Sequence, residues 1–191
     1  DPDNTEAYKT LALVYMDQGK GDMAKMTCAN ALKIDPDNAS IYNNLGLIYL
    51  KEGNTLLAAA QFTKALEKDA GFAPALANLG AIALDNKDYN LGSDSFGRLS
   101  KIKPSNTVAL NSYAVALRGQ GSDADAIAKA YEDAGKDDEA KEKRAEAKKH
   151  YEEAKETYMR VYALDKDYHE VSFNLGLLTQ RGFKDFKTAI R

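Results

Sequence analysis

The chain has 191 residues, a formal net charge of −3 and 44% hydrophobic residues. Acidic and basic side chains are interspersed, and the absence of a basic face argues against binding to nucleic acid. The single cysteine, Cys28, excludes an internal disulfide, and the longest apolar runs are too short to span a bilayer. We find no signal peptide, and any targeting segment would lie outside these residues.

Similar breaker segments recur along the chain at multiples of 34 residues. They contain Pro2, Pro36 and Pro104, and Ala70 occupies the position between the last two. Proline ends the helix that precedes it, and the Asp or Asn beside it can cap the next helix. A fixed period of this length indicates an array of short helical repeats, which we place at 5–38, 39–72, 73–106, 107–168 and 169–191.

Each of the first three units has the same order of large and small residues. Residues three or four positions apart lie on one face of a helix, and a glycine or Asn-Lys turn separates two such helices. The small residues let the two helices of a hairpin approach closely. A lone hairpin cannot bury its apolar face, so neighbouring hairpins must stack on it. In the clearest unit the pattern consists of Tyr42, Leu45, Gly46, Tyr49, a turn at Gly53, Ala58, Phe62 and Ala65.

The fourth unit begins regularly with Leu110 but is interrupted. We expect a turn at Gly119–Gly121, yet the second helix of this unit, which contains Ala154, arrives about 28 residues late. The stretch at about 122–150 repeats the hairpin pattern and predicts an inserted or extended helical hairpin.

In this stretch, Ser122 would cap a helix over 123–134, and Gly135 would end that helix. A long helix would follow from Asp137 to Leu164, and the alternative is a solvated, charged loop.

The last unit has a first helix around Leu175 and Gly176. A turn at Arg181-Gly182 would lead into the opening of a second helix at Phe183–Ile190. On this interpretation the chain is a fragment of a longer array, or an array with unusual ends.

The eight recurring positions resemble the tetratricopeptide repeat family. The resemblance covers residues 1–121 almost without gaps and most of the remainder. It implies an all-α, right-handed superhelical solenoid of antiparallel helix hairpins. It also implies a non-catalytic scaffold for protein–protein interaction, in which the first helices line a concave groove that binds a peptide or helix of a partner protein.

The resemblance also selects candidate binding residues on the first helices. An asparagine amide both donates and accepts, so a row of them could bind the main chain of an extended peptide; alternatively, these are simply polar positions on a solvated face. Leucine and methionine on the same face would anchor a partner, or else pack between repeats. The candidates are Asn44, Asn78 and Asn174, with Asn43 and Asn111 beside them, and the apolar residues Leu13, Leu47, Met16, Leu50 and Leu84.

Nothing in the sequence points to catalysis, a metal or a cofactor. His150 and His169 lack the company of ligands that a zinc site needs, and Cys28 lies on a helix face that predicts a core thiol. The family's clamp for a terminal carboxylate would require basic or Asn residues where Leu13 and Pro74 stand, so we expect no such clamp. Two alternatives to peptide binding remain at this point: a scaffold that assembles with copies of itself, and a regulatory arm of a larger multidomain protein.

Overall fold

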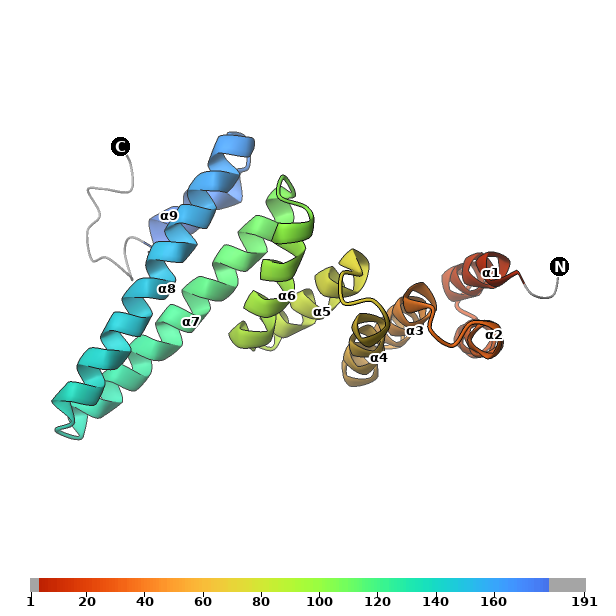
Figure 1. Cartoon of the computed structure of the whole chain (residues 1–191), viewed down its shortest axis with the longest axis horizontal. Helices are drawn as coiled ribbons and strands as arrows, with labels where there is room; N and C mark the ends of the chain where they lie inside the picture. Colours follow the sequence, from red (N-terminus) through yellow and green to blue (C-terminus); the bar gives the residue numbers. More distant parts are fainter. Residues whose placement is uncertain (1–3, 179–191) are drawn as a thin grey trace. The chain divides into compact units, whose positions relative to one another are not determined.

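The computed structural model describes residues 4–178, and the regular secondary structure in that range consists of helices joined by short turns (Figure 1). The chain forms two compact units, Asp1–Ile82 and Ala83–Arg191, whose boundary falls inside the fifth helix. No helix among the described residues is both long and apolar enough to cross a membrane. The helices are α1 (Thr5–Asp17), α2 (Gly21–Ile34), α3 (Ala39–Lys51), α4 (Thr55–Lys68), α5 (Ala73–Asp85), α6 (Tyr89–Ile102), α7 (Thr107–Asp133), α8 (Asp137–Leu164) and α9 (His169–Leu178).

The helix ends of the first unit follow from local sequence. The Asn4 side chain accepts a hydrogen bond from the Ala7 amide at 3.0 Å, and Asn54 caps α4 in the same way. Gly19 and Gly53 adopt φ values of +73° and +78°, which glycine adopts without steric cost. Both glycine turns are therefore confirmed.

Small residues in the first unit allow close packing between the helices of a hairpin. Gly46 on α3 lies directly beneath the ring of Phe62 on α4, and a Cβ at Gly46 would clash with that ring. Both residues are buried. A second cluster joins α1, α2 and α3 through fully or almost fully buried residues: Ala12, Ala24, Cys28, Ala31, Ile41 and Ile48.

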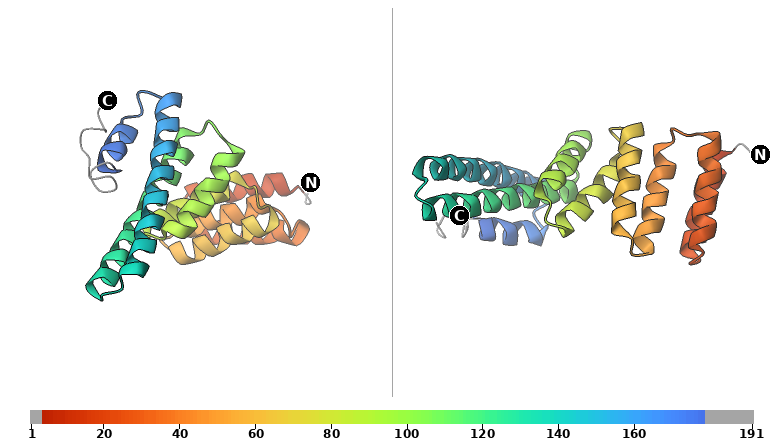
Figure 2. Two further views of the ribbon diagram at one scale, coloured as in Figure 1. Left: turned by 60° about the vertical axis from the view of Figure 1, so that its left-hand side comes forward. Right: turned by 90° about the horizontal axis from the view of Figure 1, so that it is seen from below.

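The second unit is dominated by two long antiparallel helices, α7 and α8, which lie side by side along their length (Figures 1 and 2). The expected long helix from Asp137 to Leu164 is confirmed, so the alternative of a charged loop is wrong. The core of this unit combines both helices with α9, and its buried residues include Leu110, Ala114, Leu117, Ala154, Tyr158, Val161 and Val171.

The expected turn at Gly119–Gly121 is wrong, because α7 continues through it to Asp133. Ser122 is consequently a mid-helix residue and caps nothing. The physical reason is aromatic packing: the Tyr89 ring lies against Gly119, and a Cβ built on Gly121 would be 2.6 Å from Cε1 of Tyr151. These glycines make room for tyrosine rings on a continuous helix.

The expected hairpin at 122–150 is an extension of both helices of the fourth unit. The first helices α1, α3 and α5 have 13 residues and α7 has 27; the second helices α2, α4 and α6 have 14 residues and α8 has 28. Each long helix therefore exceeds its regular counterparts by 14 residues, or about 21 Å at 1.5 Å per residue.

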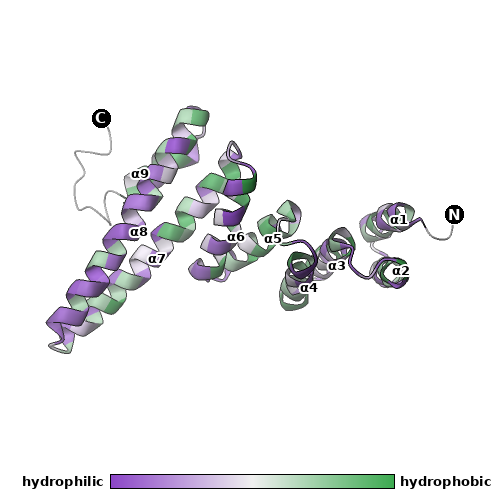
Figure 3. Ribbon diagram, in the orientation of Figure 1, coloured by the Kyte–Doolittle hydropathy of each residue, from purple (hydrophilic) through white to green (hydrophobic). Residues whose placement is uncertain are grey.

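Buried alanines line the interface of this extension. Hydrophilic residues are frequent along its two helices (Figure 3). Ala124, Ala128, Ala140 and Ala147 are all at most 4% exposed, so the two helices approach closely there. Arg144 of α8 reaches across to Asp125 at 2.9 Å and Glu132 at 3.2 Å on α7.

The fifth unit is described only through α9, which ends at Leu178. The predicted turn at Arg181-Gly182 and the predicted helix at Phe183–Ile190 lie outside the described residues.

Candidate partner-binding surfaces

In the first unit, the predicted asparagines connect the first helices of successive hairpins. Nδ2 of Asn44 on α3 donates to the carbonyl oxygen of Lys9 on α1 at 3.3 Å. Nδ2 of Asn78 on α5 donates to Oδ1 of Asn43 on α3 at 3.0 Å. Asn43 and Asn44 are 7% and 6% exposed, whereas Asn78 is half-buried. In each of these two bonds, one asparagine amide fixes the register between neighbouring first helices. The side chain of Asn78 is more accessible than those of Asn43 and Asn44.

The same arrangement recurs in the second unit. Nδ2 of Asn174 on α9 donates to Oδ1 of Asn111 on α7 at 3.2 Å, and Nδ2 of Asn111 donates to Oε2 of Glu170 at 3.4 Å. Asn111 is 7% exposed and Asn174 is half-buried. An amide has two donor hydrogens and two acceptor lone pairs, so these bonds leave spare capacity on the half-buried asparagines. Contact between these five asparagines and a partner stays a prediction.

The predicted apolar residues divide between packing and surface. Leu13, Leu47 and Leu50 are half-buried on the first helices of the first unit. Met16 packs against the buried cluster of that unit. Leu84 packs against α6: a Cβ atom added to Gly92 would lie 3.1 Å from Cδ2 of Leu84. The structure therefore places Leu13, Leu47 and Leu50 where a partner could reach them, and gives Met16 and Leu84 an internal role as well.

Cys28 and His150, which the sequence singled out for possible chemistry, have the surroundings of structural residues. Cys28 is 1% exposed, and burial raises the pKa of its thiol to about 11, which confirms a core thiol. His150 Nε2 lies 3.9 Å from Glu146 Oε1 in an ordinary i,i+4 pair. Within residues 4–178, no group of three or more His, Cys, Asp or Glu side chains is placed to hold a metal ion.

A small cavity that sequence reasoning missed opens beside Arg118 in the second unit. It encloses about 110 Å³ between α7, α8 and the start of α6. Arg118 stands eight residues after Leu110, at the helix position that Met16, Leu50 and Leu84 occupy in the earlier repeats. That change from apolar to basic is the sequence signal that could have pointed here. The lining residues are Tyr89, Val115, Arg118, Gly119, Ser122 and Tyr151.

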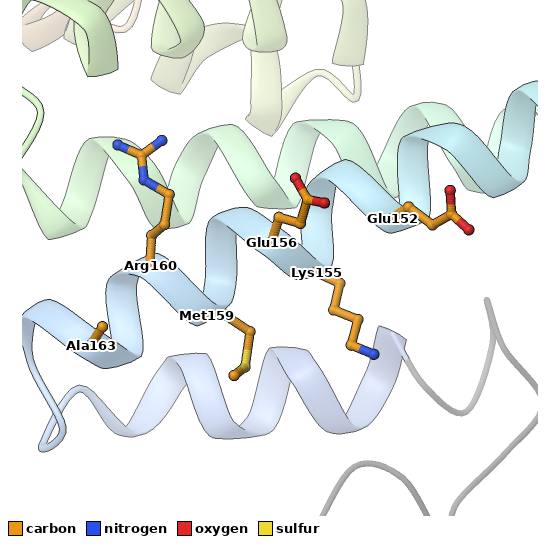
Figure 4. A pocket seen from close by; sticks show the side chains of 6 residues that line it. All are labelled: Glu152, Lys155, Glu156, Met159, Arg160 and Ala163. Atoms are coloured by element: carbon orange, nitrogen blue, oxygen red, sulfur yellow. The ribbon is translucent and has the colours of Figure 1, made fainter.

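A broader hollow runs along the outer surface of α8 (Figure 4). Its lining comes from this one helix, with Lys155 and Met159 extending on the side where α9 lies. Acidic Glu152 and Glu156 alternate with basic Lys155 and Arg160, so no single charge gathers there. This hollow has the mixed polarity of a solvated helix surface.

A shallow apolar hollow covers the outer face of α1. Leu11 and Val14 are 40% and 44% exposed there, whereas Ile48, the α3 counterpart of Val14, is 1% exposed. Ile48 is buried because it packs against the α1–α2 hairpin. The hollow is lined by Asn4, Glu6, Ala7, Thr10, Leu11 and Val14.

Comparison with known proteins agrees with this repeat pattern. The family model described as "Tetratricopeptide repeat" matches residues 5–38 and 145–168, and a model described as "TPR repeat" matches residues 29–53. The solved structure of YrrB, described as a TPR protein with an unusual peptide-binding site, superposes with a TM-score of 0.73 at 16% identity. That alignment covers 99% of this chain and 82% of YrrB. The chain is a tetratricopeptide repeat (TPR) protein.

Other solved structures share the TPR fold. MamA 41-end from Desulfovibrio magneticus RS-1 is 17% identical, with a TM-score of 0.69 over 97% of this chain and 88% of that one. The first TPR of Spaghetti (RPAP3), solved with an HSP90 peptide, is 20% identical, with a TM-score of 0.54 over 59% of this chain and 92% of that one. No curated protein matches the sequence. At these identities the likeness concerns the fold of this TPR protein.

Proposed function

We propose that this TPR protein is a non-catalytic scaffold that binds a peptide or helix of a partner protein on the first-helix face of its first unit. The binding surface would comprise Leu13 on α1, Leu47 and Leu50 on α3, and the accessible amide of Asn78 on α5. Met16 would contribute to the same surface, and Leu84 and Asn174 stay candidate contacts of the second unit by itself.

The observation that carries the proposal is the alignment of half-buried leucines beside hydrogen-bonded amides. The Asn44–Lys9 and Asn78–Asn43 bonds each join residues 35 positions apart. This separation is close to the 34-residue repeat, so equivalent positions of neighbouring first helices are held next to one another. Equivalent positions such as Leu13 and Leu47 therefore lie on matching faces of neighbouring helices. Asn44, Leu47 and Leu50 follow one another at three-residue spacing, which keeps them on one side of α3.

This surface suits a peptide or an amphipathic helix. Exposed leucine area offers hydrophobic burial, and an amide beside it can bond to a peptide main chain without regard to side chains. The two TPR proteins solved or described with peptide sites, YrrB and the Spaghetti repeat, support the class of ligand. They do not specify its sequence.

The proposal is tested with peptides selected by display on the purified chain and then measured by fluorescence anisotropy. We expect the double variant Leu47→Ala/Leu50→Ala to weaken binding at least about tenfold, because burying a leucine contributes roughly 1.5–3 kcal/mol. The matched control is Leu56→Ala/Leu57→Ala on α4, where both leucines are exposed. Equal affinity of the two double variants, with helicity retained, would remove this surface from the proposal.

Self-assembly is a second candidate, favoured by the apolar hollow on α1. Val14 and Leu11 expose area that their α3 counterparts bury against a neighbouring hairpin. A second copy of the chain would bury this exposed area. Sedimentation velocity over a wide concentration range is expected to reveal an oligomer that Val14→Asp dissociates; a monomer at every concentration excludes this candidate.

A further inference from the structure

We propose that the cavity beside Arg118, at the base of the extended fourth hairpin, is a receptor for a carboxylate of a bound peptide. Binding of a carboxylate group follows from the cavity alone. Only the statement that a peptide carries that carboxylate rests on the function proposed above.

The cavity lies at the base of the extension. Ser122 lies beyond the length of a regular first helix and lines the cavity because α7 continues, whereas Gly119 and Tyr151 stand where a regular first helix would end and a regular second helix would begin. The Tyr89 ring closes another side by packing against Gly119. The site therefore has rigid aromatic walls on helices, which hold a ligand with little loss of side-chain freedom.

Arg118 is the charged group of the cavity, and it makes no hydrogen bond or ion pair within residues 4–178. Its side chain is half-buried. In the same unit, Arg144 of the extension bonds to Asp125 and Glu132, so that arginine is engaged. A partly buried guanidinium has five donors in a fixed fork that matches a carboxylate, and leaving it unpaired is unfavourable.

The surroundings of Arg118 are suited to an acceptor and contain no competing acid. None of the six lining residues is acidic. The nearby Asp125 is already occupied, because Oδ2 accepts from the Tyr151 hydroxyl at 3.1 Å and Oδ1 pairs with Arg144 at 2.9 Å. Ser122 adds a hydroxyl to the lining.

Tyr158 is a second unpaired polar group of this unit, and it does not line the cavity. Its ring is fully buried, and its hydroxyl has no hydrogen-bond partner among the described residues. Burial raises the pKa of Tyr158 to about 12, while the charge of Arg118 acts to lower it. The hydroxyl stays protonated at neutral pH.

The size and charge of the cavity select the anion. A volume of about 110 Å³ holds only a few groups the size of a water molecule, which suits a carboxylate with one or two methylenes. One guanidinium balances one negative charge. A phosphoryl group carries nearly two charges and is usually bound by more than one cation.

The test uses nuclear magnetic resonance titrations of the ¹⁵N-labelled full chain at constant ionic strength. The probes are N-acetylglutamic acid α-amide, which presents a side-chain carboxylate, and N-acetylalanine, which presents a terminal one. N-acetylglutamine amide is the neutral control, and inorganic phosphate is the competing anion. We expect saturable shifts at the signals of residues 118, 122 and 151 with dissociation constants in the millimolar range, as befits so small a ligand. The tighter of the two carboxylates identifies its source.

Arg118→Gln is expected to weaken carboxylate binding at least about tenfold, because hydrogen bonds to charged groups are among the strong ones. The matched control is Arg160→Gln, which removes the same charge from the outer surface of α8. Circular dichroism is the check that both variants are folded. Arg118→Lys, which keeps the charge without the fork, is expected to bind with intermediate affinity.

Three results would overturn the proposal: equal binding of the glutamine probe, tighter binding of phosphate, or unchanged binding by Arg118→Gln. The Leu47→Ala/Leu50→Ala variant separates this proposal from the function proposed above. This variant is expected to keep carboxylate binding and to lose binding of the selected peptides. The failure of one proposal can therefore be told apart from the failure of the other.

Discussion

Replacement of Gly121 by alanine tests whether α7 is continuous and why its glycine is there. Gly121 is buried in the helix, and the Tyr151 ring from α8 packs against it. In an unobstructed helix, alanine would stabilise the protein by about 1 kcal/mol relative to glycine. At this position the methyl group meets a ring, so two opposing effects determine the outcome.

The structure gives the size of the obstruction. The added Cβ would lie 2.6 Å from Cε1 and 2.8 Å from Cδ1 of Tyr151, so the ring must retreat by about 0.8 Å to reach an ordinary contact of 3.4 Å. Tyr151 is only 3% exposed, and its hydroxyl is held by Asp125, so it has little room to move. Overpacking of this kind costs about 1–3 kcal/mol. After subtraction of the gain of about 1 kcal/mol in helix propensity, we expect Gly121→Ala to destabilise the protein by up to about 2 kcal/mol.

The assay is urea unfolding of four proteins: the natural chain, Gly121→Ala, Tyr151→Leu and the double variant. Without the ring, alanine at 121 meets no obstruction, and the change from glycine should stabilise by up to about 1 kcal/mol. The sign of the glycine-to-alanine effect therefore reverses between the two backgrounds. The coupling free energy from this double-mutant cycle is expected to be roughly 2 kcal/mol.

A turn at Gly119–Gly121 would give a different result. In a turn, alanine would be unfavourable because of the backbone angle, and the penalty would be the same with or without the Tyr151 ring. A penalty that survives Tyr151→Leu, or a stabilising Gly121→Ala in the natural background, would refute the packing explanation.

Three further predictions concern single side chains. Lys87 adopts φ of +60° where the other hairpins carry glycine, so Lys87→Gly is expected to stabilise by about 0.5–1 kcal/mol in thermal unfolding, and Gly53→Lys to destabilise. Iodoacetamide at pH 8 should alkylate native Cys28 at least roughly 100-fold more slowly than the unfolded chain, because burial raises the thiol pKa from 9.0 to about 11; a fast native reaction would contradict this. The Tyr158 pKa is raised from 10.0 to about 12, so its contribution to stability is complete below pH 10 and lost between pH 10 and 12, and Tyr158→Phe should flatten that loss in unfolding measured against pH.

Much of the fold could be predicted because the repeats are consistent at several levels. The breaks around Pro36 and Pro104, the turns at Gly19 and Gly53, and the pairing of Gly46 with Phe62 each follow from one local cause. Proline stops a helix, glycine adopts positive φ, and a small residue admits a ring. Each cause operates within a single hairpin, where residues near in sequence are also near in space.

The turn expected at Gly119–Gly121 failed because the decisive partners are distant. Tyr89 and Tyr151 lie about 30 residues away on either side, and nothing local distinguishes a glycine that turns from one that admits a ring. The asparagines illustrate the same limit. Their polarity predicted solvent contact, but the bonds of Asn44 to Lys9 and of Asn78 to Asn43 arise only once repeats stack.

The length of the extension explains how the fourth hairpin keeps its packing while growing. Fourteen residues make about 3.9 turns of helix, so the far end of each long helix is rotated by only about 40° from its regular orientation. Residues on both sides of the added segment can therefore serve one continuous interface, from Leu110 and Ala114 at one end of α7 to Ala124 and Ala128 towards the other. An added length of about two and a half turns would have turned that stripe away from α8. The two glycines at the base of the extension are not needed for a turn. They make room for the tyrosine rings that line the cavity beside Arg118.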